Sequence, residues 1–226
     1  MVNAVEWKKL HDELLEKKVT LVAVSKTKPV SDIVAAYEIG QRDFGENYVQ
    51  ELVEKQPQLP ADINWHYIGH LQSNKVKFIA PFVHLIHAVD SFKLLQEINK
   101  QAAKNNRVID VLLQLHIADE ETKFGLDERE LSDLIDNYSA QEGIIQNVRI
   151  RGLMGMATNT DDLKKVKADF KKLHTIFKTL SRSQFSGKSY FSVCSMGMSG
   201  DYKIAIEEGS NMVRIGSLIF GERQYN

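Results

Sequence analysis

Residues 19 to 29 read Val19-Thr20-Leu21-Val22-Ala23-Val24-Ser25-Lys26-Thr27-Lys28-Pro29, and this stretch decides the fold of the 226-residue chain. Aliphatic and β-branched residues dominate its first part, as in a strand that is covered on both faces. Pro29 cannot donate a backbone hydrogen bond to a neighbouring strand, and Ser31 and Asp32 can cap a following helix. The stretch therefore predicts a buried strand over residues 19–25 that is followed by a helix.

Lys26 stands at the carboxyl end of this strand. Because side chains alternate along a strand, its side chain shares a face with Thr20, Val22 and Val24. An amine beside such apolar residues is partly desolvated, which lowers its pKa and makes the neutral form available to attack a carbonyl carbon. The alternative is a lysine that extends to solvent from a strand end, and the local sequence alone favours it. The rest of the chain favours the reactive lysine.

Strand-like and helix-like segments alternate along the chain. Strands are predicted over residues 19–25, 42–45, 65–69, 83–89, 109–117, 148–154, 190–193 and 212–215. Helices are predicted over residues 31–39, 46–55, 73–79, 91–102, 128–138, 161–180 and 201–208, after an amphipathic helix at the amino terminus with an apolar side of Val5, Leu10, Leu14 and Leu15. Eight such steps predict an α/β fold, a single (β/α)8 TIM barrel with an extra N-terminal helix.

An open, doubly wound sheet is the alternative architecture. Two features favour the barrel. The strand count is eight, and the first and last strands both carry unusual charged residues, Lys26 and Arg214, that could share a site. In either fold, the chemistry belongs at the carboxyl ends of the strands.

The composition favours one domain over residues 1–226, because the chain is 43% hydrophobic and no linker rich in Pro, Gly or Ser divides it. The formal net charge is −1 with interspersed charges, so no basic patch indicates nucleic acid or a membrane surface. No apolar run is long enough to span a bilayer, and no signal peptide is predicted. The single cysteine, Cys194, excludes an internal disulfide and a multi-cysteine metal site. A reducing, cytoplasmic location fits these features.

Two turns near the carboxyl terminus are rich in small residues and hydrogen-bond donors. SMGMSG at residues 195–200 follows the seventh predicted strand, and RIGS at residues 214–217 ends the eighth. Small residues let the backbone curl until several N–H groups point at one anion, and barrels commonly hold phosphate between the loops after strands seven and eight. The alternative is a pair of ordinary turns. Neither stretch is a Walker A or GxGxxG motif, so a nucleotide is not indicated.

Arg214 lies between Val213 and Ile215 in an otherwise apolar strand. A buried guanidinium is costly unless hydrogen-bond acceptors satisfy it. Two roles are open for this residue. It could form a structural ion pair with a carboxylate of the barrel, or it could donate to a nitrogen or an oxyanion of a ligand.

Five stretches of the chain form a joint pattern: AVSKTKP at residues 23–29, RDFGENY at 42–48, HYIGHLQSNK at 66–75, SMGMSGD at 195–201 and MVRIG at 212–216. Together they resemble the pyridoxal phosphate homeostasis proteins, which are also called the proline synthase co-transcribed homologue family. The resemblance extends from about residue 19 to residue 223. It implies a barrel similar to the N-terminal domain of alanine racemase that binds pyridoxal 5′-phosphate (PLP).

The resemblance also assigns residues to the cofactor. It implies that PLP forms a Schiff base with Lys26, that Arg214 faces the pyridine nitrogen, and that Asn47 and Met156 lie near the ring. The phosphate contacts that it implies come from Ser195, from the backbone at Gly197, Met198 and Ser199, and from Gly216 and Ser217.

Two residues depart from the family pattern. His116 occupies a position in the fifth predicted strand where a small amide is expected, and Cys194 replaces an apolar residue. We expect a satisfied barrel histidine and a core thiol at these positions. His66 and His70 flank a strand end, but we find no carboxylate or thiol at ligand spacing and predict no metal site.

The residue types also bear on catalysis. PLP enzymes usually hold the ring nitrogen protonated with a carboxylate, whereas the guanidinium of Arg214 cannot accept a proton. Alanine racemase compensates with two bases, one of them from a second domain, and this barrel would use nearly all 226 residues. We therefore predict a monomeric PLP-binding protein of vitamin B6 homeostasis that supplies PLP with little or no catalysis, with PLP-dependent apo-enzymes as candidate recipients.

Two other functions remain open on the sequence. One is a small racemase-type enzyme with an unidentified second base. The other is a Schiff-base aldolase, in which Lys26 would attack the substrate and the two turns would hold a substrate phosphate.

Overall fold

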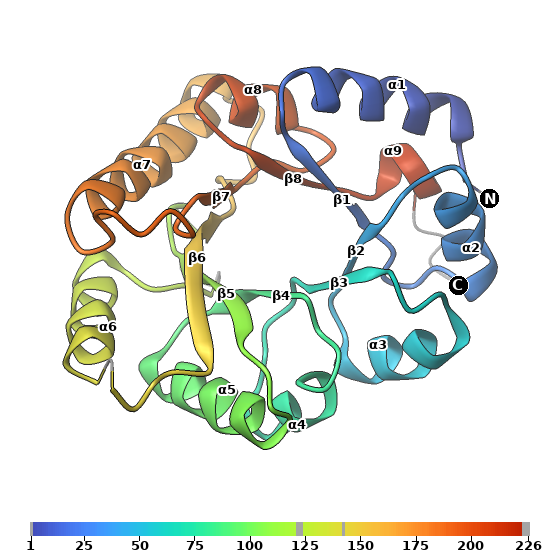
Figure 1. Ribbon diagram of the computed structural model, residues 1–226. Coiled ribbons are helices and arrows are strands. Elements are labelled where there is room, and N and C mark those ends of the chain that lie inside the picture. Colours follow the sequence, from blue (N-terminus) through green and yellow to red (C-terminus); the bar gives the residue numbers. More distant parts are fainter. Residues whose placement is uncertain (1, 121–123, 142, 223–226) are drawn as a thin grey trace.

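The computed structural model describes residues 2–120, 124–141 and 143–222, and residue 223, where the resemblance ends, lies outside this part. Eight parallel strands of the described part close into a barrel (Figure 1). They are β1 (Thr20–Val24), β2 (Asp43–Glu46), β3 (Asn64–Tyr67), β4 (Leu85–Val89), β5 (Ile109–Leu115), β6 (Val148–Gly155), β7 (Val193–Ser195) and β8 (Met212–Ile215). The sheet closes because β1 pairs with both β2 and β8, so the (β/α)8 prediction is confirmed and the open sheet is excluded.

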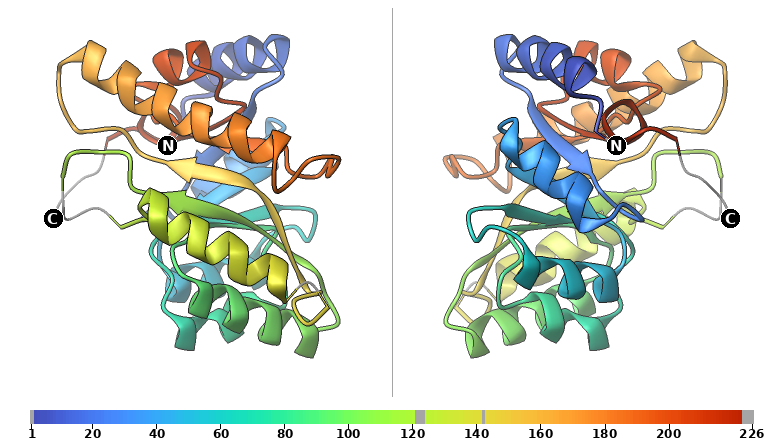
Figure 2. Two further views of the ribbon diagram at one scale, coloured as in Figure 1. Left: turned by 90° about the vertical axis from the view of Figure 1, so that its left-hand side faces the viewer. Right: turned by 90° about the vertical axis from the view of Figure 1, so that its right-hand side faces the viewer.

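Helices surround the barrel, and the two side views show them outside the strands (Figure 2). They are α1 (Ala4–Glu16), α2 (Val30–Glu38), α3 (Val49–Lys55), α4 (Val76–Ile79), α5 (Phe92–Lys104), α6 (Glu128–Ala140), α7 (Leu163–Arg182), α8 (Tyr202–Glu207) and α9 (Ser217–Phe220), with short 3-10 helices η1 (Gln56–Gln58) and η2 (Ser73–Lys75). The first and last helices lie side by side (Figure 1), and the backbone N–H of Asn3 donates to the carbonyl of Ile219 at 2.8 Å. Among the described residues, no helix has both the length and the hydropathy that a membrane crossing requires.

Strand alternation sorts the apolar residues into two groups. One group fills the barrel interior and includes Val22, Leu112 and Met212. The other group, which includes Leu21 and Val213, belongs to the larger core between the strands and the helices. The same alternation turns Arg214 inward with Met212, because both residues belong to the same face of β8.

Helix α1 buries a different stripe from the predicted one. Trp7, Leu10 and Leu14 are buried, whereas Val5 is 82% and Leu15 is 66% exposed, so the predicted apolar side is wrong at these two positions. The indole N–H of Trp7 donates to the side-chain oxygen of buried Gln41 at 2.9 Å. The large aromatic ring therefore fixes the rotation of the helix, with Leu10 and Leu14 buried beside it and Val5 and Leu15 outside.

Three boundaries near the predicted site also differ from the predictions. β7 starts at Val193, so Ser195 is the last residue of the strand rather than the first residue of the turn. Glu46 stays in β2, opposite Tyr67, and the next helix begins only at Val49. A short helix, α9, begins at Ser217, where a turn was predicted. Each observed boundary differs from the predicted one because backbone N–H and C=O groups at that point pair with a neighbouring strand or within one helical turn. The sequence pattern does not determine which of these partners the groups take.

Candidate functional site

A pocket of about 270 Å³ opens among the loops that follow β1, β7 and β8. Five predicted site residues line it together: Lys26, Met198, Ser199, Gly216 and Ser217. The remaining lining residues are Val24, Lys28, Gly200 and Gly221. No acidic side chain is among them, so within the described part of the chain the pocket presents cationic, hydroxyl and backbone groups.

The turn that carries Lys26 has an unusual backbone. Thr27 has a φ of 63°, a left-handed conformation that is uncommon for a β-branched residue. Such conformations persist where the surrounding contacts impose them, and they concentrate at functional sites. Here the backbone N–H of Thr27 donates to a carboxylate oxygen of Glu51 at 2.6 Å, and the N–H of Lys28 donates to the carbonyl of Ser25 at 3.0 Å.

A buried ion pair lies beneath this turn. The amine of Lys55 donates to Glu46 at 2.8 Å, to Glu51 at 2.6 Å and to the carbonyl of Ser25 at 2.9 Å. The hydroxyl of Ser25 donates to the same oxygen of Glu46 at 2.6 Å. Burial raises the pKa of Glu46, and the charge of Lys55 opposes that shift. The cluster of Ser25, Glu46, Glu51 and Lys55 therefore fixes the backbone on both sides of Lys26.

The sequence analysis missed this cluster. Glu51 and Lys55 stand four residues apart on α3, a spacing at which opposite charges meet on a helix, and this spacing could have revealed part of it. The contact with Glu46 has no such signal, because it depends on the position of α3 against the end of β2.

Lys28 also lines the pocket, but its amine has other partners. It donates to the carbonyl of Phe220 at 2.9 Å and to that of Gly221 at 3.3 Å. Lys28 thus connects the turn after β1 to the end of α9. Lys26 lines the same pocket and directly follows Ser25, the first residue after β1.

The turns after β7 and β8 present backbone donors to the pocket. Among the described residues, none accepts a hydrogen bond from the backbone N–H of Ser199 or Gly200. A Cβ atom at Gly216 would lie 3.0 Å from the carbonyl oxygen of Val24, so a side chain there would crowd the turn against β1. Gly197 has a φ of 97°, which favours glycine. Small residues and unengaged donors of this kind fit a phosphate group.

Arg214 is buried inside the barrel, and its role as half of an ion pair is not supported. Its guanidinium donates to the hydroxyl of Ser195 at 2.7 Å and to the carbonyl of Gly155 at 3.0 Å, and no described carboxylate forms an ion pair with it. Burial lowers the pKa of Arg214 to about 10, so the side chain stays charged at neutral pH. Two of its five N–H donors therefore have partners, and Arg214 is not among the residues that line the pocket of Lys26.

Ser195 has partners that differ from the predicted one. Its hydroxyl accepts from Arg214 and lies 3.3 Å from Nδ1 of His87, and the residue is fully buried and does not line the pocket. The structure thus places this hydroxyl against Arg214 rather than beside Ser199 and Ser217. The reason is the strand boundary: as an inward residue of β7, Ser195 points into the barrel.

Asn47 and Met156 lie outside the pocket of Lys26. Asn47 lines a separate pocket of about 310 Å³ with Tyr67, Gly69 and His70 among others, and its side-chain oxygen is buried with no described hydrogen-bond partner. Met156 follows β6 and packs against the barrel interior. Their proximity to a bound ring stays a prediction, and the unsatisfied oxygen of Asn47 is a group that a ligand donor could satisfy.

The other singled-out residues have identifiable surroundings. Nε2 of His116 lies 2.8 Å from the carbonyl of Glu120, just beyond the end of β5. Cys194 is a core thiol, as expected, and burial raises its pKa to about 12. The reasoning that His66 has no carboxylate partner is wrong, because Nε2 of His66 lies 2.9 Å from Oδ1 of Asp43.

A chain of polar side chains crosses the barrel interior from this aspartate to the arginine. Nδ1 of His66 lies 2.9 Å from Nε2 of His87, and His87 is followed by Ser195 and then Arg214. His87 is fully buried, and burial lowers its pKa well below the usual range, so its ring is neutral. This chain of contacts connects Asp43, at the amino end of the barrel strands, with the guanidinium of Arg214. It passes through His66, His87 and Ser195.

Comparison with known proteins shows the family of this chain. Residues 5–224 match the family model of the alanine racemase N-terminal domain. The chain is 41% identical over 216 residues to the pyridoxal phosphate homeostasis protein of Pasteurella multocida (strain Pm70), which covers 93% of this chain and 89% of that protein. It is 36% identical over 214 residues to the protein of the same name from Escherichia coli (strain K12), and the match covers 93% of this chain and 88% of that protein.

Solved structures lead to the same family. PipY of Synechococcus elongatus PCC7942, solved without PLP, superposes with a TM-score of 0.88 at 34% identity, over 96% of this chain and 99% of that one. The PipY structure with PLP bound superposes with a TM-score of 0.85 at the same identity and coverage. This chain therefore belongs to the pyridoxal phosphate homeostasis proteins, a family built on the alanine racemase N-terminal domain.

Proposed function

We propose that this chain binds PLP through a single barrel domain over residues 1–226 and contributes to the intracellular homeostasis and supply of vitamin B6. The observation that carries the proposal is one pocket in which Lys26 meets the donor-rich turns after β7 and β8. PipY, which is 34% identical to this chain, has been solved with PLP bound. The small-residue turns of this pocket fit a phosphorylated ligand.

We assign different parts of PLP to different residues of the pocket and of the barrel interior. We assign the covalent attachment of PLP to the amine of Lys26. We assign the phosphate to the hydroxyls of Ser199 and Ser217 and to the backbone at Met198, Gly200 and Gly216, which line the pocket. The backbone of Gly197, in the same turn, is assigned to the phosphate as well. Arg214 is assigned to the ring nitrogen, and Asn47 and Met156 are placed beside the ring. Ser195 serves as a positioning residue, because its hydroxyl holds the guanidinium of Arg214.

The same arrangement favours a carrier over a catalyst. Bound PLP supplies an electron sink whose strength depends on protonation of its ring nitrogen. Arg214 has no lone pair to share with a proton there, and its pKa of about 10 keeps it charged at neutral pH. The hydroxyl of Ser195 and the carbonyl of Gly155 accept hydrogen bonds from the guanidinium and hold it in place inside the barrel. We therefore propose little or no racemase activity, with PLP-dependent apo-enzymes as recipients of the cofactor.

Absorbance and isotope exchange test this proposal together. The purified protein, titrated with PLP, should develop a visible absorbance band that borohydride bleaches. It should then exchange the α-hydrogen of free amino acids no faster than PLP in buffer does. A protein without the band would contradict PLP binding and would favour the aldolase. Rapid exchange would contradict the carrier and would favour a racemase-type enzyme.

We also propose that the protein is a cytoplasmic monomer. Its helices cover the strands, and the single thiol, Cys194, is buried and needs no oxidising compartment.

A further inference from the structure

A second polar pocket, of about 380 Å³, lies at the opposite end of the barrel from Lys26. Its lining includes the first residues of four strands, Thr20, Asp43, Val193 and Met212, so it opens at the amino ends of the strands. Nothing in the proposed handling of PLP uses this pocket. Its other lining residues are Lys18, His66, His84, Arg151, Ser192 and Asn211.

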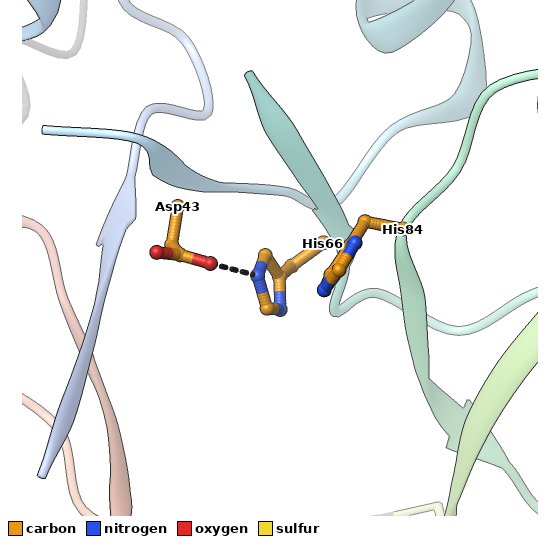
Figure 3. Close-up of side chains that lie close together, drawn as sticks. All are labelled: Asp43, His66 and His84. Carbon is orange, nitrogen blue, oxygen red and sulfur yellow. Dashed lines mark hydrogen bonds and ion pairs between the residues drawn. The ribbon is translucent and has the colours of Figure 1, made fainter. Parts of the chain in front are cut away.

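Asp43, His66 and His84 converge in this pocket (Figure 3). One potential ligand atom from each lies within 4.8 Å of the other two, and Oδ1 of Asp43 is 2.9 Å from Nε2 of His66. The ring centroids of His66 and His84 are 5.4 Å apart. Two imidazole nitrogens and one carboxylate oxygen are a ligand set that Zn²⁺ and other first-row divalent metals accept, and they leave coordination positions open.

The three residues come from adjacent elements that hold them in place. Asp43 begins β2, His66 lies within β3, and His84 directly precedes β4. His66 is 1% exposed, and Asn64 donates to the same carboxylate oxygen of Asp43 at 3.2 Å. His84 is the most exposed of the three, so it is the ligand that can adjust to close the site.

His87 supplies the contact that metal-binding histidines usually make with their other ring nitrogen. Its Nε2 lies 2.9 Å from Nδ1 of His66, and its own Nδ1 faces Ser195 at 3.3 Å. If Nδ1 of His66 donates to His87, then Nε2 of His66 presents a lone pair toward Asp43. A cation between these two atoms satisfies both of them.

The charges around the pocket are compatible with a cation. Arg151 donates to a carboxylate oxygen of Asp110 at 2.6 Å and to the carbonyl of Tyr190 at 2.9 Å, so its charge is paired. Lys18 is the other cationic residue of the lining. Because these two residues are cationic, an anion is the competing occupant of the pocket. The experiment must therefore distinguish a bound cation from a bound anion.

We propose that Asp43, His66 and His84 bind one divalent transition-metal ion at the amino-terminal end of the barrel, with His87 as the outer-shell partner of His66. The remaining coordination positions face the pocket and are open to water or to a small ligand.

Isothermal titration of the PLP-saturated, chelator-treated protein with Zn²⁺ alone tests the site. One equivalent should bind. His84→Ala, at an exposed position, should weaken binding at least about 100-fold, because loss of even an outer-shell partner costs about 10–100-fold. Asp43→Asn should have a similar effect. His70→Ala is the matched control, because His70 also lies beside a carboxylate, Asp90 at 3.2 Å, but outside this pocket.

Unchanged thermal unfolding of His84→Ala in the absence of metal would show that the variant is folded. Binding that is absent in the wild type, equal in His84→Ala, or lost equally in His70→Ala would overturn the proposal. Tight binding of inorganic phosphate in place of Zn²⁺, dependent on Lys18, would overturn it in favour of an anion site. None of these outcomes depends on whether Lys26 holds PLP.

Discussion

Replacing Lys55 with Met should destabilise the protein strongly, because it removes one half of a buried ion pair. The side chain of Lys55 is 7% exposed, that of its partner Glu46 is fully buried, and the amine also donates to Glu51 and to the carbonyl of Ser25. Breaking such a pair by removing one partner costs about 3–5 kcal/mol, since the other charge stays buried without compensation. We expect the free energy of unfolding of Lys55→Met at pH 7 to fall by about this amount, as measured by urea denaturation with an unchanged slope.

Lys8→Met is the matched control. Lys8 and Asp12 form an ion pair of 2.6 Å on α1, but their side chains are 67% and 53% exposed. Exposed pairs contribute only about 0.2–1 kcal/mol, so the two variants should differ several-fold in their cost.

The pH dependence of Lys55→Met gives a second check. Burial raises the pKa of Glu46 above its usual value of 4.5, and without Lys55 the pKa should rise further. A raised pKa in the folded state favours folding when Glu46 is protonated, so this stability is present at low pH and is lost as the pH rises through the folded-state pKa. The deficit of Lys55→Met relative to wild type should therefore be small near pH 4.5 and grow towards neutral pH. A deficit below about 1 kcal/mol at pH 7, or one that does not change with pH, would refute the reasoning.

Three further predictions concern the PLP site and the assembly. The double variant Ser199→Ala, Ser217→Ala should lower the affinity for PLP more than that for pyridoxal, by about 1.5–3 kcal/mol for each lost hydrogen bond to a charged group. Ser195→Ala is the control and should lower the two affinities equally. Equal losses of PLP and pyridoxal affinity in the double variant would show that the phosphate binds elsewhere. Arg214→Glu should bind PLP more weakly but exchange amino-acid α-hydrogens faster, and an unchanged pH dependence of the bound-PLP spectrum would assign Arg214 a structural role. Sedimentation should give a monomer, and a concentration-independent dimer would contradict it and would reopen the enzyme hypothesis.

The order of strand-like and helix-like segments was enough to predict the barrel. Strand β1 is a nearly continuous apolar run, as in a strand that is covered on both faces, and a helical pattern follows it, so the order of the elements and the topology follow from the chain. Boundaries were less predictable, because a shift of two or three residues depends on pairing. At Ser195 such a shift changed the direction of a hydroxyl from the anion pocket to Arg214.

The site was predictable where its residues follow strands directly. Lys26 and the two small-residue turns stand next to their strands, so the barrel brings them into one pocket. The cluster of Ser25, Glu46, Glu51 and Lys55 was not predictable, because it depends on how α3 packs. The juxtaposition of Asp43 and His66 depends on the register between β2 and β3, in which Asp43 lies opposite Asn64. The spacing of residues along the chain does not determine that register, so this contact could not be predicted.

The most direct test of the account is to identify the residue that carries PLP. The PLP-saturated protein is reduced with borohydride, digested and analysed by mass spectrometry. We predict a single pyridoxyl phosphate adduct on Lys26, and we predict that Lys26→Ala, which alters a partly exposed residue after β1, keeps the fold and loses the adduct. An adduct on Lys28 or Lys75, or an unchanged yield in Lys26→Ala, would contradict the assignment.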